Sequence, residues 1–484
     1  MSKADYKKFL QDKAYISGAF LSGKKSFGVY NPADGSKVGE VPDLGVEEAK
    51  QAIEAAQKAL PDWAAKSAKE RAGILKKWYQ LIVDNADSLA ALMTAEQGKP
   101  LKEAKGEIMY GAAFIEWFAE EGKRAYGDTI PSPFDGARIV TIKQPVGVCA
   151  LITPWNFPMA MIARKVGPAL AAGCTVVSKP AGETPLSALA LVVLGEEAGI
   201  PPGVLNIITT SDSKAVGKEL CESPVVRKVS FTGSTAVGKT LMEQSASTIK
   251  KISLELGGNA PFIVFEDADI DAAVEGAIAC KFRNAGQTCV CANRFYIHES
   301  VYEEFAEKFT AKVKDLKVGD GTTDGVVIGP LINEKGLKKV KEHVEDAVKK
   351  GAKVLTGGKA HELGGLFYQP TVLTDVSGDM KFCCEETFGP VAPLFKFGDE
   401  AEVIKLANDT NYGLASYFYA RDLGRVWRVA EALEYGMVAI NAGILSTEVA
   451  PFGGIKESGI GREGSHFGLD EYLETKYMLM GGLQ

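Results

Sequence analysis

The sequence contains few of the residues that build metal centres and disulfide frameworks. Its 484 residues include four histidines and eight cysteines, and no CxxC or Cys/His spacing is typical of a zinc site. Eight cysteines in a chain of this length do not indicate a disulfide framework, and we expect a reducing, cytoplasmic setting. The sequence therefore predicts no metal site.

Long apolar runs and an excess of positive charge are also missing. The most apolar stretches, such as residues 186–194, are too short to cross a bilayer, and residues 1–5 are polar and charged. We therefore expect neither a membrane span nor a secretion signal. Lys plus Arg number 55 and Asp plus Glu number 62, which gives a formal net charge of −7. A mildly acidic chain gives no electrostatic reason to expect nucleic acid as a partner.

The sequence does contain a regular alternation of strand and helix patterns. Residues 47–118 predict successive amphipathic helices, and residues 138–144 predict a strand. Further strands are predicted at 148–153, 175–178, 204–208 and 225–231, with helices at 159–172, 184–198 and 213–220. This alternation predicts an α/β fold with a parallel sheet covered by helices on both faces.

A second α/β run follows residue 254. Strands are predicted at 262–265 and 294–298, and helices at 270–282, 300–313 and 334–350. The chain is too long for one ordinary core, so the two runs indicate two α/β domains. Their facing edges could form the kind of cleft in which cofactors bind.

A glycine-containing turn joins a strand to a helix in the first run. The strand ends at Phe231, and Gly233 and Ser234 then open a helix whose N-terminal N–H groups suit a pyrophosphate. The spacing from Gly233 to Gly238 is G-x-x-x-x-G rather than G-x-G-x-x-G, so a plain strand–helix turn fits equally well. Lys179, at the end of another predicted strand, is either a ligand of ribose or phosphate or an ordinary surface lysine.

Two further segments carry residues suited to nucleophilic chemistry. Glu255 lies between two leucines just before a glycine pair, and burial there would raise its pKa towards the range useful for a general base. Small and polar residues surround Cys289, which leaves space near its sulfur. A carboxylate base could take the thiol proton, and the thiolate could then attack a carbonyl while the Cys289 N–H and a side-chain amide hold the oxyanion. Most of the other cysteines are expected to be small buried hydrophobes.

The same two segments resemble the active-site signatures of the aldehyde dehydrogenase superfamily. They stand here as Leu254-Glu255-Leu256-Gly257-Gly258 and Gly286-Gln287-Thr288-Cys289. Further motifs in the family's order are Thr153-Pro154-Trp155-Asn156-Phe157-Pro158, Phe231-Thr232-Gly233-Ser234, Glu385-Glu386-Thr387-Phe388-Gly389-Pro390 and Pro451-Phe452-Gly453-Gly454-Ile455-Lys456. The similarity extends almost end to end, and it implies oxidation of an aldehyde to a carboxylic acid with NAD⁺ or NADP⁺.

The resemblance implies a role for each matching residue. Cys289 would be the nucleophile, Glu255 the general base and Asn156 the amide donor to the oxyanion. The implied cofactor contacts are Lys179 and Trp155 in the adenosine-ribose groove, Gly233 and Ser234 at the pyrophosphate, Glu386 at the nicotinamide ribose and Phe388 beside the nicotinamide.

The resemblance also implies a fold of three parts. These are a Rossmann-type NAD(P)-binding domain from residues 1–125 and 145–255, an α/β catalytic domain from 256–445, and a small β oligomerisation arm from 126–144 and 465–484. Enzymes of this kind are homodimers or homotetramers.

One departure from the family pattern bears on the cofactor. Members that prefer NAD⁺ often have a glutamate three residues after the lysine, but Gly182 occupies that position here and Glu183 follows it. Without a carboxylate at Gly182, a 2′-phosphate meets less repulsion, and Ser178 and Lys179 could then favour NADP⁺. NAD⁺ stays open because Glu183 could still reach the ribose.

Residues 282–294 are most similar to the succinate-semialdehyde dehydrogenase branch of the superfamily. A substrate with a distal carboxylate suits an arginine fork. The resemblance implies that Arg164, Arg283 and Ser446 hold this carboxylate. Either arginine could instead form a structural ion pair, and the adjacent Thr447 could replace Ser446.

Other substrates and other activities stay open from the sequence. Tunnel depth sets the chain length of the substrate, so glutarate semialdehyde, or a neutral or amino aldehyde, is the nearest alternative. A thiol hydrolase or esterase, or a nucleotide-binding protein without turnover, would be a different class. Neither explains Glu386 and Phe388, and a binding protein would not need both Cys289 and Glu255.

Cys291 suggests a redox switch. It stands two residues after the nucleophile and could form a reversible disulfide with Cys289 that stops activity under oxidation. A passive neighbour explains its position equally well.

Overall fold

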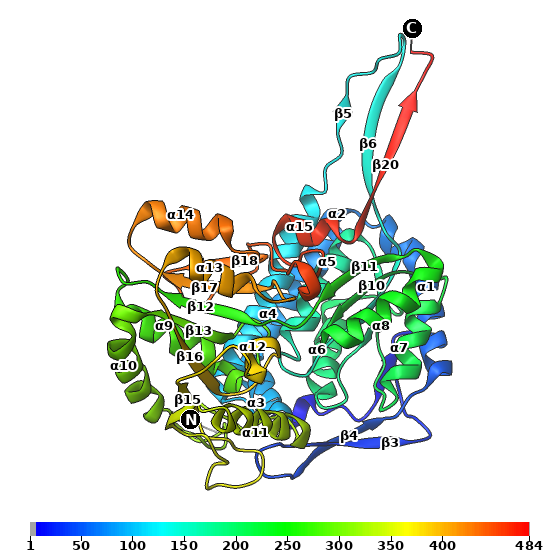
Figure 1. Ribbon diagram of the computed structural model, residues 1–484. Coiled ribbons are helices and arrows are strands. Elements are labelled where there is room, and N and C mark those ends of the chain that lie inside the picture. The colour runs from blue at the N-terminus through cyan, green and yellow to red at the C-terminus, as the bar shows by residue number, and fades with distance from the viewer. Residues whose placement is uncertain (1–5, 484) are drawn as a thin grey trace.

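The computed structural model describes residues 6–483 and consists of two α/β bodies and a projecting three-stranded arm (Figure 1). Residues 1–5, which carry the polar N-terminus considered above, and residue 484 lie outside the described residues. Within residues 6–483, no helix is both long enough and apolar enough to cross a membrane.

The first body is built on an eight-stranded sheet in the order β19-β11-β10-β7-β8-β9-β1-β2. Its five central strands are parallel, and their order β9-β8-β7-β10-β11 is the doubly wound order of a Rossmann-type domain, which confirms the predicted fold class. The edge strands are antiparallel to their neighbours. The bounds are β1 (Ala14–Ile16), β2 (Ala19–Leu21), β7 (Val148–Ile152), β8 (Thr175–Lys179), β9 (Leu205–Ile207), β10 (Val226–Thr232), β11 (Lys251–Glu255) and β19 (Gly459–Ile460).

Helices cover both faces of this sheet, and β7 shows how the sequence divides between them. Val148, Ala150 and Ile152 belong to the core on the α1 and α7 side, whereas Cys149 and Leu151 belong to the core on the α2–α6 side. All five are buried, as expected for a strand covered on both faces. The helices are α1 (Val46–Ala65), α2 (Ala68–Asp84), α3 (Ala86–Gln97), α4 (Leu101–Glu121), α5 (Ala160–Ala172), α6 (Pro185–Ala198), α7 (Ser213–Glu222) and α8 (Thr235–Ser245).

The second body has a seven-stranded sheet in the order β14-β15-β16-β13-β12-β17-β18. Every neighbouring pair is parallel except β14 with β15. The strands are β12 (Ala260–Val264), β13 (Ala292–His298), β14 (Lys353–Thr356), β15 (Thr371–Thr374), β16 (Val391–Phe397), β17 (Ala415–Tyr419) and β18 (Met437–Ile440). The helices are α9 (Ile270–Phe282), α10 (Tyr302–Lys314), α11 (Glu334–Lys349), α12 (Lys381–Cys384), α13 (Glu400–Asn408) and α14 (Leu423–Ala432).

After residue 445 the chain returns to the first body. β19 pairs with β11, and α15 (Ser465–Asp470) packs against α4 and α5. The expected arm segment 465–484 includes α15, which packs mainly on the first body and also contacts β20. A separate hairpin, β3 (Ser26–Tyr30) and β4 (Lys37–Pro42), lies near the N-terminus.

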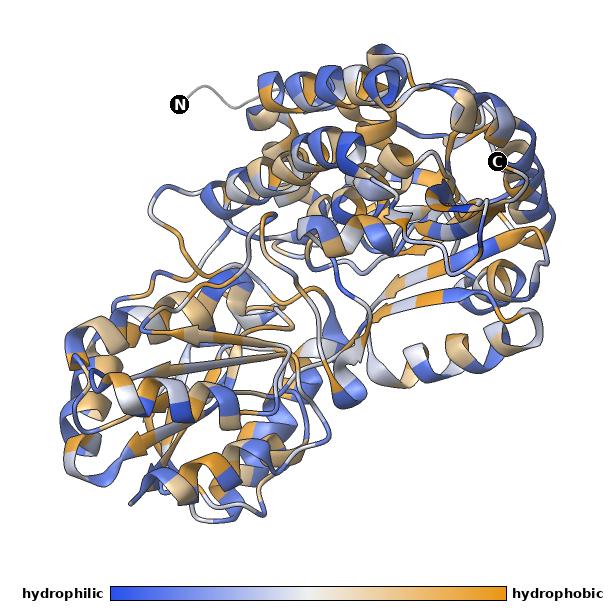
Figure 2. Ribbon diagram, turned by 90° about the horizontal axis from the view of Figure 1, so that it is seen from above, coloured by the Kyte–Doolittle hydropathy of each residue, from blue (hydrophilic) through white to orange (hydrophobic). Residues whose placement is uncertain are grey.

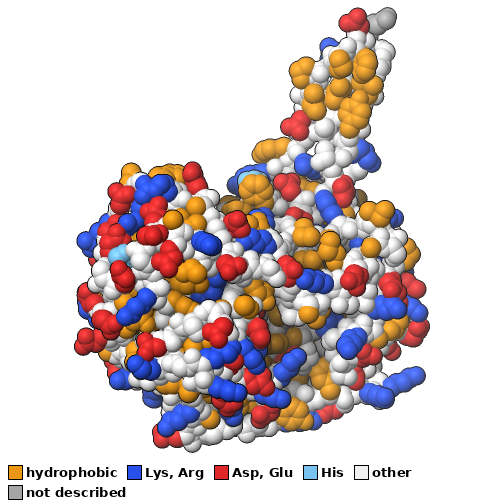
Figure 3. All heavy atoms as spheres, viewed as in Figure 1, with side chains coloured by type: hydrophobic (Ala, Val, Ile, Leu, Met, Phe, Trp, Pro, Cys, Tyr) orange, Lys and Arg blue, Asp and Glu red, His pale blue; other side chains and the backbone are white. Residues whose placement is uncertain are grey.

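The arm is an antiparallel sheet in the order β20-β6-β5, from β5 (Thr129–Ile130), β6 (Arg138–Pro145) and β20 (Leu473–Met480). It projects well beyond the two bodies (Figure 1). Hydrophobic side chains gather on its surface (Figure 3), and the exposed ones include Ile130, Phe134, Ile142, Tyr477, Leu479, Met480 and Leu483.

The two bodies lie side by side, each with its sheet between helices (Figure 2). The first body contributes the carboxyl ends of its strands to the predicted site, since Lys179 and Glu255 are the last residues of β8 and β11. The second body contributes segments that precede its strands, since Cys289 comes before β13 and Glu386 before β16. The site is therefore built from opposite strand ends of two sheets.

Candidate active site

The segment that leads to Cys289 has an unusual backbone. α9 is followed by the short 3₁₀ turn Arg283–Gly286, in which Asn284, Ala285 and Gly286 have φ angles of 50°, 53° and 75°. Non-glycine residues rarely adopt this left-handed conformation, and it persists only where surrounding contacts hold it. At Gly286, a Cβ atom would lie 2.2 Å from the Gly389 carbonyl oxygen, so a side chain does not fit there.

Asn284 is held by contacts on all sides. Its backbone N–H donates to Glu103 Oε2 at 2.8 Å, and Gln97 Nε2 donates to its Oδ1 at 3.1 Å. Its own Nδ2 donates to the Asn156 carbonyl oxygen at 3.0 Å. Helices α3 and α4 of the first body thus fix the nucleophile segment of the second body.

Asn156, the predicted oxyanion donor, lies directly beside this segment. Its Nδ2 donates to the Gln287 carbonyl oxygen at 3.0 Å, and its carbonyl oxygen accepts from Lys99 Nζ at 2.7 Å. Lys99 is itself buried and ion-paired with the buried Glu107. Sequence reasoning missed Lys99, in the short connection between α3 and α4, and Glu107, within α4, because neither stands in a motif that marks a function.

Gly258 lies between Cys289, the predicted nucleophile, and Glu386, the predicted nicotinamide-ribose ligand. A Cβ on Gly258 would lie 2.4 Å from the Cys289 carbonyl oxygen, so only glycine permits this approach. The Gly258 N–H donates to Glu386 Oε1 at 3.2 Å. Burial raises the pKa of Glu386 to about 7, although the Gly258 hydrogen bond opposes this shift.

Glu255 is buried, and its Oε2 has no hydrogen-bond partner among the described residues. Burial raises the pKa of Glu255 well above its usual value, the Glu463 carboxylate adds to the effect, and Arg164 and Lys165 oppose it. A carboxyl group with a raised pKa is suited to act as a general base near neutral pH.

Glu463 organises the charges around Glu255. Its carboxylate forms buried ion pairs with Arg164 and Lys165, and Lys165 also donates to Ser230 Oγ at 3.0 Å. Sequence reasoning missed Glu463, because 298 residues separate it from Lys165 and no motif marks it.

Cys289 is half-buried and lies within electrostatic reach of four predicted site residues, Arg164, Glu386, Glu255 and Cys291. Burial raises the pKa of its thiol to about 12, Arg164 opposes this shift, and Glu386 and Glu255 add to it. The thiol is therefore protonated at rest, and nucleophilic attack requires a base that removes its proton.

The surroundings of Lys179 at the end of β8 contain a polar group without a partner and space beside Gly182. Lys179 Nζ donates to Ser213 Oγ and to the Pro180 carbonyl oxygen, both at 3.1 Å. The buried Ser178 hydroxyl has no hydrogen-bond partner among the described residues. The atoms nearest to a Cβ built on Gly182 are 3.7 and 3.8 Å away, so no clash enforces glycine there. Glu183, the alternative carboxylate, is exposed.

The glycine turn differs in detail from the prediction. The Gly233 N–H donates to the Glu255 carbonyl oxygen at 3.0 Å, so it is not free for a pyrophosphate. Ser234 is the exposed N-cap of α8, and the free N–H groups belong to the first turn of that helix.

Trp155 and Phe388, both predicted cofactor contacts, pack against each other. Their rings pack edge to face with centroids 5.5 Å apart. Trp155 therefore lies next to the residue expected at the nicotinamide, although Thr153, two residues earlier, still bonds to the Lys179 carbonyl oxygen. Phe388 has a φ of 56°, a strained conformation for an aromatic residue.

The residues expected to hold a substrate carboxylate are only partly brought together. Arg283 and Ser446 line one pocket with Thr288 and Tyr417. Arg164 lies at the Glu463 ion pair, as the structural alternative anticipated, but its Nη2 is buried without a hydrogen-bond partner among the described residues.

Ser446 and Cys291 complete the predicted set. The adjacent Thr447 hydroxyl donates to Glu448 Oε2 at 3.3 Å, which leaves Ser446 as the hydroxyl in the Arg283 pocket. Cys291 is a buried free thiol whose Sγ donates to the Gly286 carbonyl oxygen at 3.2 Å.

Comparison with known proteins identifies the family. The sequence matches the aldehyde dehydrogenase family over residues 20–478. The NADP⁺-dependent succinate-semialdehyde dehydrogenase of Escherichia coli (strain K12) is 63% identical over 473 residues, which cover 97% of this chain and 98% of that protein. The glutarate-semialdehyde dehydrogenase of Pseudomonas aeruginosa is 60% identical over 478 residues, which cover 98% and 99%.

The fold agrees over the same length. A crystal structure of succinate-semialdehyde dehydrogenase from Burkholderia pseudomallei has a TM-score of 0.98 and 61% sequence identity, and it covers 99% of this chain and 100% of that one. The similarity thus includes both α/β bodies and the arm. The chain belongs to the aldehyde dehydrogenase family.

Proposed function

We propose that this aldehyde dehydrogenase oxidises succinate semialdehyde to succinate and prefers NADP⁺ over NAD⁺. The observation that carries the substrate is the pocket beside the nucleophile, in which Arg283 and Ser446 line one space with Thr288. A guanidinium and a hydroxyl in a confined pocket suit a carboxylate. The name and 63% identity of the Escherichia coli relative support both substrate and cofactor.

Catalysis would begin when Glu255 takes the Cys289 thiol proton, directly or through water. The thiolate then attacks the aldehyde carbon, so that an S–C bond forms and the carbonyl electron pair moves to oxygen. The Asn156 amide and the Cys289 N–H stabilise this oxyanion. A bound nicotinamide supplies the hydride acceptor that turns the thiohemiacetal on Cys289 into a thioester. After the Glu255 carboxyl group has released this first proton to solvent, its carboxylate takes a proton from water, which attacks the thioester. The C–S bond then breaks, the carboxylic acid leaves, and the Cys289 thiolate takes its proton back from Glu255.

The cofactor preference rests on the groove at the end of β8. Ser178 and Lys179 would bind the 2′-phosphate of NADP⁺, and no carboxylate stands at Gly182 to repel it. Glu386 would bind the nicotinamide ribose, with Trp155 and Phe388 beside it.

Glutarate semialdehyde is the second candidate substrate. It carries the same aldehyde and distal carboxylate with one more methylene, and the Pseudomonas aeruginosa relative bears its name. One methylene in a pocket changes binding by about 1–3 kcal/mol, so both substrates could react.

The direct test compares rates of nicotinamide reduction with succinate semialdehyde, glutarate semialdehyde and butanal, each with NADP⁺ and with NAD⁺. Arg283→Ala should lose most of kcat/KM for the two acids and little for butanal, while the exposed control Arg421→Ala should match wild type. If butanal reacts as well as the acids in wild type, the substrate is wrong and only the dehydrogenase assignment survives.

We also propose that the protein is a cytoplasmic homodimer or homotetramer assembled through its arm, and that Cys291 can form a reversible disulfide with Cys289. Mass spectrometry of peroxide-treated protein should detect a Cys289–Cys291 crosslink that thiols reverse. Irreversible oxidation of Cys289 alone would contradict the switch.

A further inference from the structure

Two buried polar groups near the nucleophile lack partners, and both can donate hydrogen bonds. One is the Tyr110 hydroxyl on α4, and the other is Arg164 Nη2 on α5. Neither has a hydrogen-bond partner among the described residues. Helices α4 and α5 pack against each other, so the two side chains project from neighbouring elements.

Packing fixes the position of each group. The Tyr110 ring packs edge to face on Phe114, with centroids 5.0 Å apart, and contacts the small apolar cluster that includes Phe157. Arg164 is held on one side by the Glu463 ion pair and lies over the Phe452 ring at 4.3 Å. Because packing holds both side chains in place, motion away from this position does not explain why their donor groups lack acceptors.

A third donor lies close to this pair. Arg283 lies over Phe157, a member of the apolar cluster that Tyr110 contacts, and its guanidinium carbon is 4.8 Å from the Phe157 ring centroid. Burial raises the pKa of Tyr110, and the Glu463 carboxylate adds to this effect. Arg164 and Arg283 oppose it through their charge, and Arg164 also opposes it by approaching the phenol oxygen as a hydrogen-bond donor, which leaves the phenol proton without an acceptor. The phenol therefore keeps its proton and can donate it.

Unpaired buried donors are costly, and native structures explain them by water, ions or ligands. Two guanidinium groups lie near the phenol, and the Glu463 carboxylate pairs with only one of them, Arg164. A partner that accepts several hydrogen bonds and carries negative charge therefore suits these donors. A carboxylate meets both requirements, and it accepts from charged and neutral donors at once.

We propose that Tyr110 is a substrate-binding residue whose hydroxyl donates a hydrogen bond to the distal carboxylate of an ω-carboxy aldehyde, together with Arg164 and Arg283. This inference rests on the proposed function and adds a neutral donor to the charged ones. The phenol can donate a hydrogen bond to a carboxylate but not to an apolar chain end, so it favours the carboxylate substrate without adding a further buried charge.

The test uses Tyr110→Phe, which removes one oxygen atom and keeps the ring that packs on Phe114. A hydrogen bond to a charged group is worth about 1.5–3 kcal/mol, so kcat/KM for succinate semialdehyde should fall about 10- to 150-fold. The value for butanal should change by less than about threefold. Succinate, as a competitive inhibitor, should bind more weakly to the variant by a factor similar to the loss with succinate semialdehyde.

Tyr302→Phe is the matched control, since its hydroxyl is buried against the Leu394 carbonyl oxygen in the second body. This control should leave the succinate semialdehyde-to-butanal ratio unchanged. If wild type prefers succinate semialdehyde and Tyr110→Phe keeps that preference, or loses both substrates equally, the role of Tyr110 is wrong. If wild type itself shows no preference, the proposed function fails first.

Discussion

Lys179 shows what burial does to a lysine that we propose as a phosphate ligand. Burial lowers its pKa to about 8, and Glu183 opposes the shift. The charged form is present below pH 8 and is lost as the pH rises above it, so the attraction for a 2′-phosphate should weaken there. We expect the ratio of kcat/KM for NADP⁺ to that for NAD⁺ to fall between pH 7 and pH 9.

This pH dependence is measured with both cofactors at saturating aldehyde. In Lys179→Met the ratio should be low at every pH. A wild-type ratio that stays constant from pH 7 to pH 9 would separate Lys179 from phosphate binding.

Gly182 allows a second test of the same groove. The nearest atoms to an added Cβ are 3.7 and 3.8 Å away, so Gly182→Glu should fold normally. The new carboxylate would repel a 2′-phosphate and accept hydrogen bonds from ribose hydroxyls, which should move the preference at least tenfold towards NAD⁺. Gly182→Gln, which has the same shape without charge, is the control and should shift the preference much less.

Single residues also mark the limit of what the sequence could predict. Cys289, Glu255 and Asn156 stand in motifs whose residue types their chemistry constrains, and the structure gathers all three around one point. Tyr110 and Glu463 do not stand in any such motif. Their significance comes from a burial and a pairing that exist only once distant segments have folded together.

The nucleophile turn is an element whose shape depends on one side chain. Asn284 tolerates a left-handed backbone and also donates to the Asn156 carbonyl oxygen. Asn284→Gly keeps the backbone conformation but removes this bond, so the Asn156 amide should be less well positioned for the oxyanion. We expect kcat to fall about tenfold with KM nearly unchanged.

Ala285→Gly is the matched control for this turn. It lies next to Asn284 with a φ of 53°, and its side chain makes no hydrogen bond, so its kcat should stay near wild type. Equal losses in the two variants would mean that backbone flexibility, rather than the Asn284 amide, limits catalysis.

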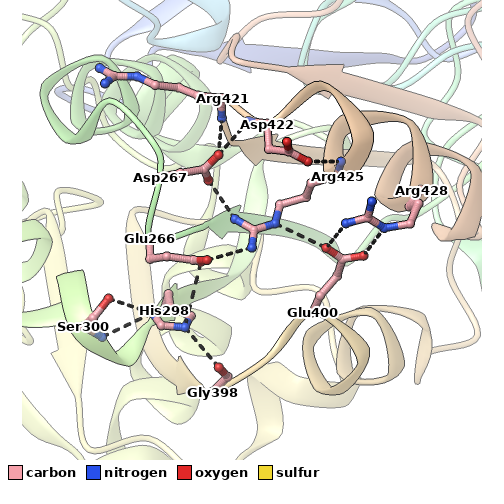
Figure 4. Close-up of polar contacts among 10 residues, drawn as sticks. All are labelled: Glu266, Asp267, His298, Ser300, Gly398, Glu400, Arg421, Asp422, Arg425 and Arg428. Atoms are coloured by element: carbon pink, nitrogen blue, oxygen red, sulfur yellow. Dashed lines mark hydrogen bonds and ion pairs between the residues drawn. The ribbon is translucent and has the colours of Figure 1, made fainter.

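The far end of the second sheet carries an ion-pair network where ligands often bind in α/β folds. Arg425, at the start of α14, bonds to Glu266 and Asp267 after β12 and to Glu400 at the start of α13 (Figure 4). Its side chain is 18% exposed. The carboxyl ends of this sheet are thus closed by charge pairs, which fits the placement of Cys289 at the opposite end.

Removing Arg425 should lower the free energy of unfolding of the second body without affecting the catalytic residues. Arg425→Met leaves three carboxylates without their shared cation, and we expect a loss of about 2 kcal/mol, or about 5 °C in thermal midpoint. Arg421→Met is the control, because this exposed residue pairs with Asp269 alone and should cost less than about 1 kcal/mol. A thermal midpoint unchanged by Arg425→Met would mean that the network is energetically neutral.

Elements were predictable where local chemistry marks their ends. The helix predicted at 270–282 has those bounds, and Asp269 caps it by accepting from the Ala272 N–H. The three-residue strands β1 and β2 were not predicted, since so short a pattern carries little information. β1 is placed by pairing with β9 in another part of the chain, and β2 is placed by pairing with β1.

At the scale of the whole molecule, the arm carries a patch of exposed hydrophobic side chains (Figure 3). Patches of this kind usually mark a surface that another protein covers, and we expect a second copy of this chain to cover this one. Leu479→Asp, on the outermost part of β20, should therefore yield smaller assemblies, as measured by light scattering after size exclusion. Leu363→Asp, equally exposed but in the β14–β15 connection, should leave the molar mass unchanged. An unchanged mass for Leu479→Asp would show that the arm does not join the subunits.

The return of residues 446–480 to the first body also has a consequence for synthesis on the ribosome. Strand β6 and the buried cations Arg164 and Lys165 are translated long before β20 and Glu463, their partners in the folded state. A nascent chain that has not yet reached these residues holds an unpaired strand and two uncompensated charges. The first body can therefore complete its packing only after the second body has been translated, and a translation arrest before residue 463 leaves an inactive chain prone to aggregate.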